Sequence, residues 1–388
     1  MLTVREQVML SGFTTLGLGG PARRFVEAAT EPELIAEVRA AGRRGEPLLI
    51  LGGGSNLVIA DDGFPGTVVR VATRGVHRAA AGRPDAVRVT VAAGEDWDGV
   101  VASCVAAGLA GVECLSGIPG LTGATPIQNV GAYGQEVAET ITGVRVYDRA
   151  QDQVTDMAPG DCGFGYRTSA LKRDPDGRFV VLGVSFELAA GGRSRPVRYA
   201  ELARCLGVAE GERVPLADVR AAVLGLRRGK GMVLDPADPD SRSAGSFFTN
   251  PVLDDAQFAA LRQVVAGRYG PGTRIPQFPA GSGRVKVPAA WLIGQAGFHK
   301  GYPANGAPPG TGPEGAAGVA ADAGVAADAG VAGMAGARIS AKHTLALVNP
   351  GGASTADIVR LAREIRDRVR DSFGVELTPE PVLVGVTL

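Results

Sequence analysis

The segment Ser116–Gly134, SGIPGLTGATPIQNVGAYG, places the strongest constraint on how this chain can fold. Glycine and proline recur so often in it that neither a helix nor a regular strand can persist. A long irregular loop inside a compact domain is usually functional. Four of its polar side chains could join the backbone N–H groups in contacting a ligand: Thr122, Thr125, Gln128 and Asn129. These groups suit the binding of a ligand with a pyrophosphate and a flat polar ring. The alternative is that the loop has a purely structural role.

The segment Leu51–Leu57, LGGGSNL, is a second glycine-rich turn, and it follows the apolar run Pro47–Leu51. The run predicts a buried strand. The glycines let the backbone approach a ligand closely with its N–H groups facing phosphate oxygens. The pattern is not G-x-G-x-x-G, and no helix signal follows as the Rossmann fingerprint requires. An ordinary hairpin turn is the alternative, but together the two segments predict one dinucleotide that is not held in the Rossmann manner.

Alternating strand and helix signals predict an α+β or α/β protein. Helices are predicted for residues 30–42, 95–107 and 355–373, and strands for residues 47–51, 68–71, 87–91 and 179–188. The last helix has an apolar stripe that should face the core, with arginines and aspartates on the solvated face. The stripe consists of Ile358, Leu361, Ile365, Val369 and Phe373.

Charge and cysteine usage exclude several classes of protein. Of the 388 residues, 40 are Lys or Arg and 40 are Asp or Glu, so the formal net charge is zero. No overall electrostatic field therefore favours binding to nucleic acid or to a membrane surface. The four cysteines form no C-x-x-C pair, which fits a reducing compartment better than a disulfide scaffold. We find no signal peptide and no stretch long and apolar enough to span a bilayer. These features predict a cytoplasmic protein.

The segment from about Tyr302 to Gly336 has a biased composition, with GVAADA repeated from Gly318. Such a sequence cannot bury enough apolar surface to offset the entropy of ordering the chain. It predicts a flexible surface insertion, and a functional lid is the alternative.

Three further motifs carry candidate catalytic groups: Arg167 in CGFGYRTS, Ser246 in AGSFFTNP and Glu380 in LTPEPV. An arginine can grip a carboxylate with two parallel hydrogen bonds. Ser246 lies in no G-x-S-x-G elbow, so a serine nucleophile is poorly supported and an acid role fits better. The alternative for Arg167 is a surface ion pair, the alternative for Ser246 is a helix or turn cap, and the alternative for Glu380 is a solvated loop acid.

In this order, LGGGSN, IPGLTGATPIQNVGAYG, GYR, GSFFTNP and LTPEPV resemble the UDP-N-acetylenolpyruvoylglucosamine reductase family over nearly the whole chain. The resemblance implies an α+β fold with a vanillyl-alcohol-oxidase-type (PCMH-type) FAD-binding unit of two subdomains and a C-terminal α+β substrate-binding domain. The expected bounds are 1–72 with 383–388, 73–222, and 223–382 with the Ala/Gly insert at about 302–337.

The same resemblance implies an oxidoreductase of peptidoglycan precursor synthesis. Such an enzyme holds FAD noncovalently, takes NADPH as co-substrate and reduces the enolpyruvyl group of UDP-N-acetyl-3-O-(1-carboxyvinyl)-glucosamine to give UDP-N-acetylmuramate. Hydride would pass via FAD, and protonation of the enolate would follow. The implied partners are small molecules only, with no nucleic acid and no membrane, and the implied state is a monomer.

The resemblance also assigns site residues. The implied catalytic residues are Arg167, Ser246 and Glu380, with Ser246 or Glu380 as the proton donor. The implied substrate-binding residues are Tyr166, Tyr199, Lys230, Asn250 and Gln295. The implied FAD-binding residues are Leu51, Gly52, Gly53, Gly54, Ser55, Asn56, Leu57, Ser116, Ile118, Pro119, Gly120, Gly123, Thr125, Pro126, Gln128, Asn129, Gly131, Ala132 and Tyr133.

Two rival functions remain open at this point. A different flavin enzyme of the same fold, such as an oxidase of alcohols or hydroxy acids, has no reason to carry GSFFTNP with Tyr199 and Lys230. A noncatalytic UDP-sugar-binding protein would be colourless or redox-silent, and it would not need Arg167, Ser246 and Glu380 together.

Overall fold

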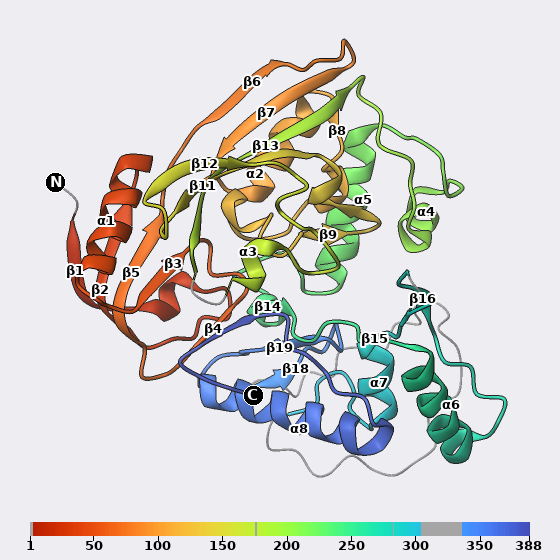
Figure 1. The fold of residues 1–388 in the computed structure, drawn as a ribbon. Helices are drawn as coiled ribbons and strands as arrows, with labels where there is room; N and C mark the ends of the chain where they lie inside the picture. The colour runs from red at the N-terminus through yellow and green to blue at the C-terminus, as the bar shows by residue number, and fades with distance from the viewer. Residues whose placement is uncertain (1–2, 175–176, 282, 304–335) are drawn as a thin grey trace.

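The computed structural model describes residues 3–174, 177–281, 283–303 and 336–388, arranged as an upper and a lower lobe (Figure 1). The Ala/Gly insertion predicted at about residues 302–337 lies almost entirely outside the described residues. None of the described helices is long and apolar enough to cross a membrane.

A small sheet near the N-terminus carries the first glycine-rich turn. Its strand order is β1-β2-β5-β3, with β2, β5 and β3 parallel. The strands are β1 (Val4–Met9), β2 (Pro21–Ala28), β5 (Phe64–Val71) and β3 (Leu48–Leu51). Helix α1 (Glu31–Arg43) begins at a capping box formed by Thr30 and Glu33, which confirms the helix predicted for residues 30–42. The turn after β3 leads into β4 (Leu57–Ile59) rather than into a helix.

The rest of the upper lobe is built on an antiparallel sheet of order β12-β11-β13-β7-β6, with β8 also paired to β13. Its strands are β12 (Gln153–Met157), β11 (Ile141–Asp148), β13 (Phe179–Ala190), β7 (Ala86–Ala92), β6 (Val76–Ala80) and β8 (Leu109–Ala110). Helix α2 (Trp97–Ala106) buries Trp97 against Phe186 of β13. The irregular segment 116–134 runs beside this helix and contains only short elements: a 3₁₀ turn at Thr122–Ala124 and β9 (Gly131–Ala132), which pairs with β10 (Gln135–Glu136).

Two helices and their connecting loops cover one end of the upper lobe. Helices α4 (Ala200–Leu206) and α5 (Leu216–Gly229) contact each other, and α5 also contacts α2. The short helix α3 (Ala170–Arg173) follows the GYRTS motif and lies at the boundary between the lobes (Figure 1).

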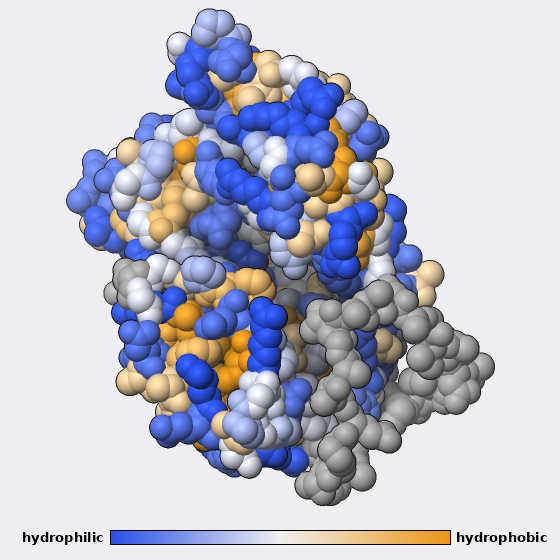
Figure 2. Space-filling view, turned by 90° about the vertical axis from the view of Figure 1, so that its right-hand side faces the viewer, coloured by the Kyte–Doolittle hydropathy of each residue, from blue (hydrophilic) through white to orange (hydrophobic). Residues whose placement is uncertain are grey.

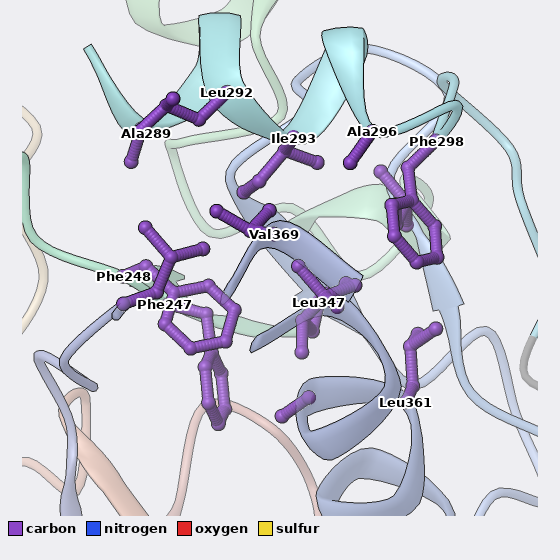
Figure 3. Packing of buried hydrophobic residues seen from close by; sticks show 14 of the residues in the cluster. Phe247, Phe248, Ala289, Leu292, Ile293, Ala296, Phe298, Leu347, Leu361 and Val369 are labelled. Carbon is purple, nitrogen blue, oxygen red and sulfur yellow. The ribbon is translucent and has the colours of Figure 1, made fainter. Parts of the chain in front are cut away.

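The lower lobe has its own core around two small sheets, β14-β19-β18 and β15-β17-β16. The elements are β14 (Ser243–Ser246), β15 (Val252–Leu253), α6 (Asp255–Tyr269), β16 (Phe278–Pro279), β17 (Val285–Lys286), α7 (Ala289–Gln295), β18 (Arg338–Ile339), β19 (Ala346–Val348) and α8 (Thr355–Phe373). The apolar stripe predicted for α8 is buried in this core, and its Arg and Asp residues lie on the other face. Phe247 and Phe248 pack in the same core with residues of α7 and α8 (Figure 3). Figure 2 shows an indentation between the two lobes and hydrophobic residues gathered on the lower one.

The C-terminus returns to the first glycine-rich turn. Strand β20 (Val382–Val384) pairs in parallel with β4, and the Val382 N–H donates to the Asn56 carbonyl (2.9 Å). Just before β20, the Glu380 N–H donates to the Phe247 carbonyl (2.9 Å). The LTPEPV segment is therefore fixed between the first glycine-rich turn and the SFF motif of the lower lobe.

Candidate active site

Both glycine-rich segments line one cavity of about 610 Å³, as do β3, β13 and the start of the lower lobe. Arg167, Ser246 and Glu380 also line this cavity, although they come from three distant parts of the chain. The structure therefore brings together the three side chains that the sequence singled out as candidate catalytic groups.

The two glycine-rich segments touch backbone to backbone at Gly53 and Gly120. A Cβ on Gly53 would lie 2.6 Å from the Gly120 Cα, a distance that real Cβ atoms do not adopt. Gly54 has φ +61°, and a Cβ there would meet the Phe13 carbonyl oxygen. Glycine is required at both positions because the turn needs a close approach and a left-handed backbone.

Arg167 and Glu380 form an ion pair at the cavity wall, with 3.0 Å between Nε and Oε1. The Arg167 guanidinium also donates from Nη2 to the Gly131 carbonyl (2.7 Å), which ties it to the second glycine-rich segment. Arg167 has φ +52°, a conformation that costs energy for a residue with a Cβ. Such strain persists only where the surroundings fix it, and it is commonly found at functional sites.

Glu380 is held through both its backbone and its side chain. Its carbonyl accepts from Asn56 Nδ2 (3.3 Å) and Gln128 Nε2 (3.4 Å), one residue from each glycine-rich segment. Burial raises the pKa of the Glu380 carboxyl, while the nearby cations of Arg167 and Lys172 act to lower it. A desolvated carboxyl with a raised pKa beside an arginine is typical of a group that takes part in proton transfer or charge stabilisation.

Ser246 ends strand β14 and is half-buried beside Gly245, whose φ is +75°. The Ser246 hydroxyl makes no hydrogen bond to any residue that the structure describes, so it is free to donate into the cavity. Pairing of β14 with β19 across Ser246 and Ala346 fixes the backbone at this point.

Tyr166 and Asn250 lie next to each other beside Arg167. Amide groups of Asn250 act to lower the pKa of the Tyr166 phenol, although burial raises that pKa overall. The Asn250 side chain accepts from the Ala289 N–H at the start of α7 (2.9 Å). Lys286 Nζ lies 4.3 Å from the centre of the Tyr166 ring, a cation–π contact.

None of the five substrate-binding residues implied by the resemblance lines this cavity. Tyr166 and Asn250 line a second pocket, which shares Arg167 with the cavity. Lys230 follows α5 and forms an ion pair with Glu201, with 2.7 Å from Nζ to Oε2. Tyr199 precedes α4, is 44% exposed and packs edge-on against Tyr133 at 5.5 Å between ring centres. Gln295 ends α7, where its backbone carbonyl accepts from the Tyr269 hydroxyl (2.8 Å).

Most of the implied FAD-binding residues line the cavity, and six do not. The lining ones are Gly52, Gly53, Gly54, Ser55, Asn56, Leu57, Ile118, Pro119, Gly120, Gly123, Thr125, Gln128 and Gly131. The six outside the lining are Leu51, Ser116, Pro126, Asn129, Ala132 and Tyr133. Among these, the Ser116 hydroxyl donates to the Glu113 carbonyl (2.7 Å), and Asn129 Nδ2 donates to Glu136 (2.7 Å) and to the Gly165 carbonyl (3.0 Å). Such contacts shape the segment behind the cavity wall.

Sequence reasoning missed several polar residues of the cavity wall, among them Trp97 and Arg227. Trp97 Nε1 and Arg227 Nε are buried donors without a hydrogen-bond partner among the described residues. Burial lowers the pKa of the Arg227 guanidinium. Trp97 begins α2, where the sequence pattern indicated only a core position, and Arg227 lies in the last turn of α5, for which the sequence predicted no helix, so no local signal identified either donor. Buried donors are normally satisfied, so both point to a ligand with acceptor atoms in this cavity.

No cluster of His, Cys, Asp or Glu able to hold a metal occurs among the residues that the structure describes.

The comparison with protein families defines the class of the upper lobe. A model of the FAD binding domain matches residues 22–157, from β2 to β12, and so includes both glycine-rich segments. The chain is therefore a flavoprotein with an α+β FAD-binding fold, and its cavity suits FAD: the glycines form a cradle that a Cβ would fill, and two residues of its wall have buried donors without a hydrogen-bond partner among the described residues. The α+β class expected from the sequence is confirmed.

The comparisons with individual proteins identify the family. A model of the UDP-N-acetylenolpyruvoylglucosamine reductase C-terminal domain matches residues 308–384. The enzyme of that name from Thermobifida fusca is 56% identical, over 99% of this chain and 98% of the relative. The one from Streptomyces coelicolor is 54% identical, over 98% and 90%. The crystal structure of the Thermus caldophilus enzyme matches with a TM-score of 0.59 at 25% identity, over 99% of this chain and 100% of that chain. This chain belongs to the UDP-N-acetylenolpyruvoylglucosamine reductase family.

Proposed function

We propose that this chain uses NADPH to reduce the enolpyruvyl group of UDP-N-acetyl-3-O-(1-carboxyvinyl)-glucosamine, giving UDP-N-acetylmuramate for peptidoglycan synthesis. The observation that carries this proposal is the convergence of Arg167, Glu380 and Ser246 on the cavity lined by both glycine-rich segments. That arrangement offers a cation, a largely desolvated carboxyl and a free hydroxyl beside the place where a flavin would lie.

The residues that would hold FAD are those of Gly52–Leu57 and of residues 118–131 that line the cavity, with Trp97 and Arg227 as donors to its acceptor atoms. When bound, FAD carries hydride between NADPH and the sugar substrate. Backbone N–H groups of glycine-rich turns suit its pyrophosphate. No His or Cys lies within residues 115–137, so attachment would be noncovalent.

Arg167 would stabilise the negative charge that develops on the substrate when hydride reaches the methylene carbon of its enolpyruvyl group. The charge spreads into the adjacent carboxylate, and a fixed guanidinium stabilises it without reorganising during the reaction. The ion pair with Glu380 and the bond to Gly131 keep Arg167 in place. Its strained backbone means that the pocket, rather than the local chain, sets its position.

Ser246 would then donate a proton to the neighbouring carbon, completing the lactyl ether. Its hydroxyl is free, whereas Glu380 Oε1 accepts from Arg167 and is already engaged. A serine hydroxyl is a weak acid, so it can act only where the enolate is strongly basic and water is excluded. Glu380 would orient Arg167, and its raised pKa keeps it the second candidate for the proton donor.

The substrate would contact residues on both lobes. Tyr166 and Asn250 lie beside Arg167, and Lys230 would pair with the diphosphate as a mobile point charge. Tyr199 and Gln295 complete the set that we carry over from the family resemblance. We also propose the three-part division 1–72 with 383–388, 73–222 and 223–382, a monomeric state and a cytoplasmic location.

The experiment is a half-reaction analysis of the purified yellow holoenzyme. NADPH should bleach the flavin absorbance, and the enolpyruvyl UDP-sugar should restore it anaerobically with formation of UDP-N-acetylmuramate. If instead an alcohol or hydroxy acid bleached the oxidised flavin and oxygen restored its absorbance, with no response to the UDP-sugar, the chain would be a flavin oxidase. A protein that binds the UDP-sugar without reducing it would be a noncatalytic binder.

A further inference from the structure

Lys230, the residue that we assign to the substrate's diphosphate, already has an anionic partner within the chain. Its Nζ lies 2.7 Å from Glu201 Oε2, and both side chains are about one-third exposed. Ion pairs at this exposure are weak enough for a ligand to break.

Glu201 belongs to the same short helix, α4, that Tyr199 precedes. Tyr199 packs on Tyr133 of the second glycine-rich segment, and Lys230 Nζ lies 5.7 Å from the centre of the same Tyr133 ring. The ion pair and the two aromatic contacts thus join α4 to the end of α5 and to the flavin-binding segment.

The surroundings of Lys230 carry an excess of positive charge. The imidazole of His343 is half-buried, and its pKa falls to about 4 because of its desolvation and because Lys230, Lys300 and Arg227 lie near it. Glu201 is the acid that acts on His343 in the opposite direction. A cluster of cations with one carboxylate suits a ligand with several negative charges.

We propose that Glu201 competes with the diphosphate of the ligand for Lys230, and so lowers the affinity of the site for diphosphate compounds. This inference rests on the proposed function, because it takes Lys230 as the diphosphate partner. A carboxylate and a diphosphate on one ammonium group would repel each other, so the diphosphate must displace Glu201. Both NADPH and the UDP-sugar carry a diphosphate, and Glu201 would weaken the binding of both, which favours exchange of one for the other.

The test is calorimetric titration of UDP, as the diphosphate probe, into the oxidised holoenzyme. Glu201→Gln should bind UDP about threefold to fivefold more tightly than the wild type, the range expected for removal of a partly exposed ion pair. Glu210→Gln is the matched control, because Glu210 is exposed on the same segment and loses the same charge. It should bind UDP as the wild type does.

Two further variants distinguish an error in the assignment of Lys230 from an error in the proposed competition by Glu201. Lys230→Gln should weaken UDP binding, and adding Glu201→Gln to it should give no gain. If Lys230→Gln leaves UDP binding unchanged, the assignment of Lys230 in the proposed function is wrong. If Lys230→Gln weakens binding but Glu201→Gln leaves it unchanged or weakens it, only the competition is wrong, and weakened binding would show that Glu201 orients Lys230. Glu201→Ala, checked by thermal melting, serves as a second substitution if the glutamine variant is unstable.

Discussion

Arg167 Nε lies 3.0 Å from Glu380 Oε1, although one residue follows a Gly-Phe-Gly turn in the upper lobe and the other precedes the final strand. The pair exists because the LTPEPV segment runs between the SFF motif of the lower lobe and the first glycine-rich turn. It therefore couples the position of the candidate charge-stabilising group to the docking of the two lobes.

Ser246→Ala should leave flavin reduction by NADPH intact and slow the second half-reaction by orders of magnitude, because only the second step needs a proton donor. Stopped-flow absorbance of the flavin measures both halves separately. Ser185→Ala, in the upper sheet, is the control. Equal losses in both halves would remove Ser246 from its role and favour Glu380.

Arg167→Lys should lower the rate of the second half-reaction by about 100-fold to 1,000-fold, the usual loss when one fixed donor to a developing charge is removed. An ammonium group cannot bond Glu380 and Gly131 while it also faces the substrate, as the planar guanidinium can. Single-turnover kinetics of the reduced enzyme give the rate. Arg173→Lys, at an exposed residue of the neighbouring helix α3, is the control, and full activity in Arg167→Lys would contradict the assignment.

Glu380 should make the protein less stable as pH rises above the ordinary carboxyl range. Its pKa in the folded protein is raised by burial, so the unfolded chain loses its proton first, and the free energy of unfolding falls until the folded carboxyl titrates too. Below the ordinary pKa both states hold the proton and there is no such effect. Urea titrations of the holoenzyme at several pH values should show that Glu380→Gln abolishes this decline. Glu376→Gln, which alters an exposed acid nearby, should retain it.

Gly53→Ala should destabilise the protein by about 1–3 kcal/mol, the usual cost of an overpacked site, and weaken FAD binding. The added Cβ would force the Gly120 backbone away and open the contact between the two glycine-rich segments. Thermal melting and flavin release on dilution measure the two effects. Gly82→Ala is the control, since a Cβ there meets nothing within 4 Å. Unchanged flavin retention in Gly53→Ala would show that this contact does not shape the cofactor site.

Local patterns were sufficient for the elements whose signals are local. The capping box at Thr30 and Glu33 and the apolar stripe of α8 each depend on residues a turn or two apart, and both predicted helices are present. The glycine-rich segments could also be recognised, because a dense run of Gly and Pro excludes regular structure by itself. Trp97 and Arg227 could not be identified, because a tryptophan on a core-facing helix position and an arginine in the last turn of a helix are both ordinary until the missing hydrogen-bond partner is seen.

The sequence by itself determined which side chains are available and which segments must be irregular, because residue type sets backbone freedom and chemical character. It predicted the dinucleotide-binding segments and three candidate catalytic residues, and only the family resemblance, not any local pattern, implied that these residues lie together beside the flavin. Only the tertiary structure decided that Arg167, Ser246 and Glu380 face one cavity, and that Lys230 pairs with Glu201. These relationships depend on packing and strand pairing between distant parts of the chain, which no local pattern encodes.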